Sequence, residues 1–195
     1  RNSSFLLHNS HLVIPRFFDI HTHVHFEAFK NDASETIKRA LDEGVWMIQV
    51  GTQQDTSAAA IKLAESVPEG VYATVGLHPI HTQASYHDKK ELGPSFAKAS
   101  EGKEEGFTSR GEVFEASYYR QLAQDPKVVA IGECGLDYYR IESTSTALGT
   151  GTELGMKKQK DAFMQQIELA LERNLPLMVH CRPTPGTQDA YADIL

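Results

Sequence analysis

Two histidines separated by a single residue are the first candidates for chemistry in this chain. His21 and His23 follow the apolar run at 17–20, and His25 comes two residues later. In a strand alternate residues lie on one face, so His21 and His23 can point the same way from its end. Neutral imidazole is a good ligand for zinc, manganese and similar divalent ions. The pair predicts half of a metal site; two surface histidines on a polar loop are the alternative.

Three later apolar runs are each followed, within a few residues, by a residue that could do chemistry. These residues are His78 after the run at 71–75, Glu133 after the run at 128–131, and His180 after the run at 175–179. Charged and imidazole groups at such positions need partners, so packing alone explains them poorly. Reactive side chains at the carboxyl ends of successive parallel strands are typical of a (β/α) barrel active site.

Glu133 is the residue that could join these histidines into one site. Its two oxygens can bridge two cations roughly 3.5–4 Å apart, as two-metal hydrolytic sites require. We therefore predict Glu133 as a catalytic residue and His21, His23, Glu133 and His180 as metal ligands. A buried salt bridge is the alternative for Glu133, and a hydrogen-bonded core histidine is the alternative for His180. Asp19 either orients an imidazole or simply ends its strand.

His78 and Arg182 are predicted at the substrate edge of the site. His78, beside Pro79, could donate to a phosphate oxygen or lie near the metals, and a structural turn histidine is the alternative. Arg182 could hold a phosphate in a bidentate way, or form a surface salt bridge. The segment at 138–140, Tyr-Tyr-Arg, could stack on a base and hold a phosphate, or pack against the rim of the barrel.

Short apolar runs that alternate with amphipathic helices must position these residues. The predicted strands are 17–20, 45–50, 71–75, 128–131 and 175–179, and the predicted helices are 34–43, 55–66 (with Asp55 as N-cap), 114–124, 156–174 and 188–195. Near-continuous β-branched runs of this kind fit strands that are buried on both faces. Strand then helix, repeated, predicts a parallel sheet with right-handed crossovers.

Two segments interrupt this alternation. Residues 84–111 are highly charged and are predicted as a solvated, partly helical insertion. Residues 142–155 are rich in Ser, Thr and Gly, a flexible-loop composition that fits either a lid over the site or an ordinary surface loop. We predict an N-terminal extension at 1–16 and a single barrel domain at 17–195 that contains both insertions.

The bulk composition fits one globular domain. The chain has 195 residues, of which 41% are hydrophobic and 23% are charged, and its net charge of −7 excludes a global basic footprint for duplex binding. A nucleic acid would be bound locally, through metal ions and a few Arg and Lys residues. Two cysteines imply no disulfide framework, which favours a cytoplasmic or nuclear location. No apolar run is long enough for a membrane span, so no membrane partner is predicted.

Four segments resemble the motifs of the TatD family of metal-dependent deoxyribonucleases. They are Phe-Asp-Ile-His-Thr-His at 18–23 for its DxHxH opening, 75–79 for its GxHP motif, 130–138 for its GExGLDY signature, and 159–182 for its helix–strand segment ending in HxR. The stretch Gly-Glu-Cys-Gly-Leu-Asp-Tyr-Tyr-Arg at 132–140 is long and specific, whereas the HxH pair alone is not.

This resemblance implies a TIM-type (β/α) barrel, two divalent metal ions (Zn, Mg or Mn) and hydrolysis of DNA phosphodiester bonds by a metal-activated water. It also implies the roles assigned above: metal binding for His21, His23, Glu133 and His180, and substrate contact for His78 and Arg182. Two alternatives stay open. One is a hydrolase of another ester or amide on the same scaffold, and the other is an inactive fragment or scaffold.

The family also places a metal-binding His after the sixth strand and an essential Asp after the eighth. This chain stops at Leu195. A TIM barrel typically needs about 250 residues, and we count about five of eight βα units here. We therefore expect an incomplete barrel with unpaired strand edges, belonging to a longer protein, and the activity of this segment alone stays open.

Overall fold

The computed structural model describes residues 14–87, 107–139, 141 and 150–195. Its centre is a five-stranded parallel sheet in the order β1-β2-β3-β6-β7. The strands are β1 (Phe17–Thr22), β2 (Val45–Val50), β3 (Val71–Val75), β6 (Val128–Asp137) and β7 (Leu177–Arg182). Because every neighbouring pair is parallel, the carboxyl ends of all five strands lie at the same edge of the sheet.

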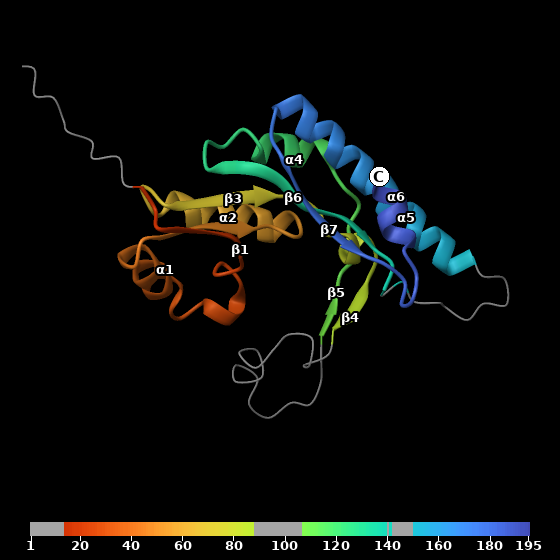
Figure 1. Cartoon of the computed structure of the whole chain (residues 1–195), viewed down its shortest axis with the longest axis horizontal. Helices are drawn as coiled ribbons and strands as arrows, with labels where there is room; N and C mark the ends of the chain where they lie inside the picture. The colour runs from red at the N-terminus through yellow and green to blue at the C-terminus, as the bar shows by residue number, and fades with distance from the viewer. Residues whose placement is uncertain (1–13, 88–106, 140, 142–149) are drawn as a thin grey trace, which may run out of the picture.

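Helices follow the strands in the predicted alternation. They are α1 (Ala33–Asp42), α2 (Gln54–Glu65), α4 (Ala116–Leu122), α5 (Thr150–Arg173) and α6 (Asp189–Ile194), with short 3-10 turns η1 (Glu27–Phe29) and η2 (Pro79–Thr82). Helix α2 packs on β2 and β3, and α5 packs on β6 (Figure 1). The main core lies between sheet and helices, where Ala60, Ala64, Val71 and Val75 are fully buried. The predicted α/β class is confirmed: the strands and helices form half of a (β/α) barrel.

Several element bounds differ from those predicted. Strand β6 continues past the apolar run to Asp137, because its pairing with β7 extends as far as Asp137 and Arg182. Glu133 therefore lies inside a strand rather than after one. Helix α2 begins at Gln54, and the expected N-cap role of Asp55 is wrong. The Thr56 hydroxyl instead accepts the Gln53 backbone N–H at 2.8 Å.

The two outer strands do not have the expected burial on both faces. In β1 the side chains of Phe17, Phe18 and Ile20 are 58%, 43% and 62% exposed. The reason is that β1 and β7 each have a strand neighbour on one side only within the described sheet. Phe18 is partly covered by an aromatic neighbour, the Tyr72 ring, which stacks on it with a centroid distance of 6.0 Å.

The charged segment at 84–111 begins and ends in strands. β4 (Ser85–His87) and β5 (Phe107–Ser109) form an antiparallel pair that projects away from the main sheet (Figure 1). Residues 88–106 lie outside the described residues, so the expected helical part stays a prediction. Residues 142–149 lie outside them as well, whereas 150–155 form the first turns of α5 rather than a loop. The predicted N-terminal extension at 1–16 is described only from residue 14 onward.

Among the described helices, none is both long and apolar enough to cross a membrane.

Candidate metal centre

Glu133 lies at the centre of a cluster of imidazoles at the carboxyl edge of the sheet. Its side chain is largely buried, and its Oε2 lies 3.3 Å from His21 Nε2. Its Oε1 lies 3.2 Å from His180 Nδ1 and 3.6 Å from His78 Nε2. Burial alone would raise the pKa of Glu133, but the hydrogen bond from His180 and the nearby imidazoles lower it to about 2. The carboxylate is therefore ionised, with Oε2 directed toward His21 and Oε1 toward His180 and His78.

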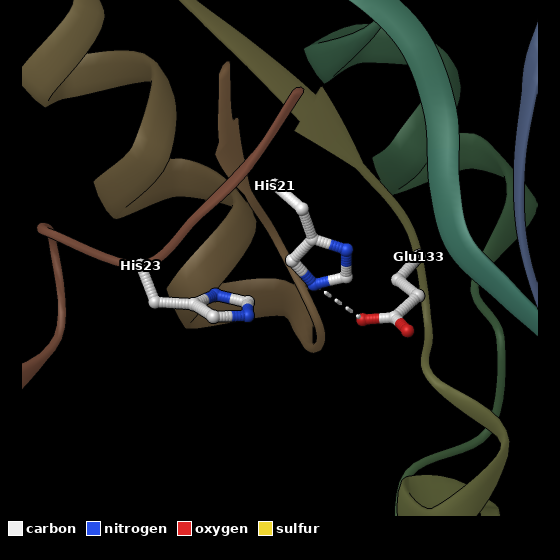
Figure 2. Close-up of side chains that lie close together, drawn as sticks. All are labelled: His21, His23 and Glu133. Atoms are coloured by element: carbon white, nitrogen blue, oxygen red, sulfur yellow. Dashed lines mark ion pairs between the residues drawn. The ribbon is translucent and has the colours of Figure 1, made fainter. Parts of the chain in front are cut away.

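The first group that could hold a metal ion consists of His21, His23 and Glu133. Their ligand atoms all lie within 4.8 Å of one another. Figure 2 shows the two imidazoles side by side, with His21 directed at the carboxylate. His23 Nδ1 lies 3.0 Å from the Val50 carbonyl oxygen, which can only accept, so Nδ1 carries the proton and Nε2 keeps its lone pair. Burial and the neighbouring His21 lower the pKa of His23, which favours this neutral form.

The second group that could hold a metal ion consists of His78, Glu133 and His180. His78 is buried, and burial lowers its pKa to about 3. Its Nδ1 accepts the backbone N–H of Ile80 at 3.2 Å. A neutral imidazole has one N–H, so this bond places the proton on Nε2, the nitrogen that faces Glu133. In this tautomer His78 is a hydrogen-bond donor toward the centre and not a ligand.

His180 lies between two carboxylates. Its Nδ1 faces Glu133, and its Nε2 lies 2.9 Å from Oδ2 of Asp137. Burial would lower the pKa of His180, but the hydrogen bonds to Asp137 and Glu133 outweigh it and raise the pKa to about 9. Asp137 was missed as a site residue by the sequence analysis. It lies four positions after Glu133, a spacing that places both on one face of a regular strand, and strand β6 was predicted too short to include it.

Buried glutamines hold the backbone beside the site residues. Gln166 of α5 accepts the Leu77 N–H at 2.8 Å and donates to the Leu77 carbonyl at 3.1 Å. Gln159 does the same for Asp137, with both distances 2.8 Å. Gln49 of β2 accepts the N–H of Val24, next to His23, at 2.9 Å. Their sequence signal was weak: Gln159 and Gln166 are polar residues two helical turns apart beside an apolar stripe.

Ser57 of α2 has a similar role at the end of β3. Its hydroxyl accepts the Gly76 N–H at 3.2 Å and lies 3.3 Å from the Gly76 carbonyl oxygen. The contact requires glycine at 51 as well, because a Cβ there would lie 2.4 Å from Ser57 Oγ. Helix α2 can therefore approach the strand ends closely.

Gly135 allows β6 and β7 to approach each other beside Glu133. Its φ is 129°, and a Cβ there would lie 2.1 Å from the His180 carbonyl oxygen. The glycine thereby permits the short distance between Glu133 and His180.

The remaining sequence candidates divide between the site and the scaffold. The Arg182 guanidinium lies over the Tyr139 ring, 3.7 Å from its centroid, beside the cluster. Tyr138 is buried, and its hydroxyl donates to Asp193 at 2.8 Å, which agrees with the packing alternative. The Asp19 carboxylate accepts the backbone N–H of His21 at 3.1 Å and orients the backbone rather than an imidazole. Arg140 lies outside the described residues.

His25 belongs to neither group. Its Nδ1 lies 3.4 Å from Gln49 Oε1, and burial lowers its pKa to about 4.

Imidazole nitrogens together with an ionised carboxylate form a donor set that suits divalent metals. The chain's own residues therefore fit a metal centre around Glu133.

Comparisons with known proteins give several matches. The family model for TatD related DNase matches residues 18–195. The chain is 36% identical over 166 residues to "3'-5' ssDNA/RNA exonuclease TatD" of Pantoea vagans, which covers 85% of this chain and 50% of that protein. It is 33% identical over 179 residues to the protein of the same name from Yersinia pseudotuberculosis, with 91% and 54% covered.

A solved structure is similar as well: YJJV, a TatD homolog from Escherichia coli k12, has a TM-score of 0.55 at 25% identity. The matched region covers 87% of the present chain and 52% of the YJJV chain. The likeness supports the expected TIM-type barrel architecture. The chain spans about half the length of the curated relatives it matches.

Proposed function

The chain belongs to the TatD related DNase family, and we propose that it functions in metal-dependent hydrolysis of DNA phosphodiester bonds. One observation carries the proposal: an ionised, buried Glu133 lies between histidines of three other strand ends. An isolated salt bridge would need one partner, whereas this carboxylate faces three imidazoles. The matched relatives are named as exonucleases of single-stranded DNA and RNA, which supports single-stranded nucleic acid as the substrate.

Two divalent ions, Zn, Mg or Mn, are the proposed cofactors. His21, His23 and Glu133 would hold one of them, and Glu133 with His180 would hold the other. When bound, such ions supply positive charge at the phosphoryl oxygens and lower the pKa of the attacking water.

Asp137 positions His180 in this scheme. Its Oδ2 faces His180 Nε2, so the carboxylate can keep a proton on that nitrogen and leave Nδ1, on the Glu133 side, as the ligand atom. The Gln159 side chain fixes the Asp137 backbone on both its N–H and its carbonyl. His180 is thereby held from the side opposite to Glu133.

His78 and Arg182 are proposed to bind the substrate phosphate. The bond from Ile80 leaves His78 with its proton on Nε2, so it can donate to a phosphoryl oxygen without a change of tautomer. Stacking of the Arg182 guanidinium on Tyr139 uses a face of the group and not its in-plane N–H donors. Both side chains therefore have donors to offer to an anionic oxygen.

Glu133→Gln tests the proposal, because it keeps the shape of the side chain and removes its charge. Cleavage of a labelled single-stranded DNA in the presence of Mn²⁺ should fall at least about 100-fold. Manganese binding, measured by calorimetry, should fall with it. Glu172→Gln is the matched control, since Glu172 is an exposed residue of α5 that pairs with Arg120.

Two results would contradict the proposal. One is a Glu133→Gln protein that cleaves DNA like the wild type. The other is a wild-type protein that hydrolyses simple esters or amides and leaves DNA intact, which would favour the alternative hydrolase on this scaffold.

A further inference from the structure

An exposed tyrosine and a stacked arginine form a flat surface beside the metal centre. The Tyr139 side chain is 49% exposed, although aromatic rings of this size are usually more buried. The Arg182 guanidinium lies 3.7 Å from its ring centroid. No hydrogen bond or ion pair within the described residues involves the Arg182 guanidinium. We define Tyr139 and Arg182 as the stacking pair.

The stacking pair is fixed to the same residues as the metal centre. The Tyr139 N–H donates to Oδ1 of Asp137 at 3.1 Å, while Oδ2 of the same carboxylate bonds His180. The Arg182 carbonyl accepts the backbone N–H of Tyr138 at 2.8 Å. The Asp137 carboxylate therefore joins the backbone of Tyr139 to the side chain of His180, a proposed metal ligand.

We propose that the stacking pair binds a nucleobase of the substrate strand, next to the phosphate that is cleaved. The inference rests on the proposed nuclease function and adds to it a residue, Tyr139, and a type of contact. A nucleotide combines a flat π surface with a phosphate. The pair combines a half-exposed ring with a planar cation whose in-plane donors have no partner among the described residues, and these match those two parts.

The contact also sets a preference for the form of the substrate. A base that stacks on Tyr139 must leave its own helical stack, which costs more free energy in a duplex than in a single strand. The net charge of −7 provides no general attraction for a duplex that would offset this cost. The stacking pair thus selects single-stranded nucleic acid.

The experiment compares binding of an intact oligonucleotide and of its abasic versions by the wild type, three variants of the stacking pair and one control variant. The probes are a short oligothymidylate with phosphorothioate linkages that resist cleavage, and versions of it in which one base at a time is replaced by an abasic site. The proteins are the wild type, Tyr139→Leu, Tyr139→Phe and Arg182→Lys, each with Mn²⁺ and followed by fluorescence anisotropy. Tyr191→Leu is the matched control, since Tyr191 of α6 is also an exposed tyrosine, at 44%.

We expect Tyr139→Leu to weaken binding of the intact oligonucleotide by about tenfold, the loss of one stacked base. Tyr139→Phe should restore binding, because the ring and not the hydroxyl makes the contact. Arg182→Lys should weaken binding although it keeps the charge, since an ammonium cannot stack. For the abasic probe at the bound position, the wild type and Tyr139→Leu should bind equally.

Equal binding of the intact oligonucleotide by Tyr139→Leu and the wild type would overturn the inference. So would an equal loss in Tyr191→Leu. Cleavage of the unmodified oligonucleotide by the wild type, measured in parallel, separates the two proposals. If the wild type cleaves DNA and Tyr139→Leu binds normally, only the stacking pair is refuted. If the wild type neither cleaves nor binds DNA, the nuclease function itself is refuted, and the stacking pair with it.

Discussion

Replacing Gln166 by methionine should destabilise the protein without touching any proposed ligand. The side chain is 1% exposed, and its amide makes bonds to the Leu77 N–H, the Leu77 carbonyl and the Ala162 carbonyl at 2.8, 3.1 and 3.3 Å. Methionine has a similar length and shape but offers no comparable donor or acceptor. Each buried backbone group left without a partner costs about 1–3 kcal/mol.

With two such groups at Leu77, and some gain from burying an apolar side chain, we expect a loss of about 3 kcal/mol in the free energy of unfolding. Urea denaturation measures this loss, and an unchanged slope would show that the native and unfolded states keep their compactness. Gln165→Met is the matched control. Gln165 is the preceding residue of α5 and is only partly buried. Within the described residues its side chain makes one hydrogen bond, to the Asp161 carbonyl at 3.1 Å, so the loss of unfolding free energy should stay within about 0.5 kcal/mol.

The reasoning would be refuted if Gln166→Met and Gln165→Met were equally stable. It would also be refuted if Gln166→Met lowered the free energy of unfolding by less than about 1 kcal/mol. Either result would mean that water or a shift of the backbone satisfies Leu77 in place of the glutamine. His78 directly follows Leu77, so a backbone shift at Leu77 would also move His78, the proposed hydrogen-bond donor to the substrate phosphate.

Three further outcomes are expected. Gly51→Ala would place a methyl group 2.4 Å from Ser57 Oγ, so we expect the free energy of unfolding to fall by about 1–3 kcal/mol. Calorimetry should show a lower melting temperature, and an unchanged melting temperature would contradict the close packing. Asp137→Asn should lower the affinity for manganese by about 10–100-fold in a titration. If the variant and the wild type bound manganese equally well, Asp137 would not position His180 as a ligand. Ellman's reagent should modify Cys181 in the native protein and Cys134 only after unfolding, because burial raises the pKa of Cys134 to about 12. Reaction of both thiols at the same rate in the native protein would contradict this.

The fold, and the edge at which the proposed site residues meet, were predictable because both depend on local patterns. Alternating apolar runs and amphipathic segments determine a parallel sheet, and a parallel sheet gathers its strand ends at one edge. His21, Glu133 and His180, which are far apart in the chain, meet there in the structure. Their roles as ligands, like that of His23, and the substrate contact of His78 remain proposals that rest on geometry.

Other features depend on neighbours that the sequence does not name. Asp137 was missed because the strand that contains it continues by pairing with β7, beyond its apolar run. The exposure of Phe18 follows from the edge position of β1, which a hydrophobic pattern does not encode. The role of Gln166 needs the packing of α5 against the segment between β3 and η2, since glutamine on a helix has no chemical signature of its own.

The glutamine bonds make two backbone amides independent reporters of the site. The N–H groups of Leu77 and Asp137 are bonded to the side chains of Gln166 and Gln159, whereas most protected amides in the sheet are bonded to a neighbouring strand. Hydrogen exchange at these two amides therefore reports the rotation of a side chain as well as the opening of the sheet. Loosening of the sheet edge that carries the proposed metal centre can in this way be observed separately from unfolding of the domain.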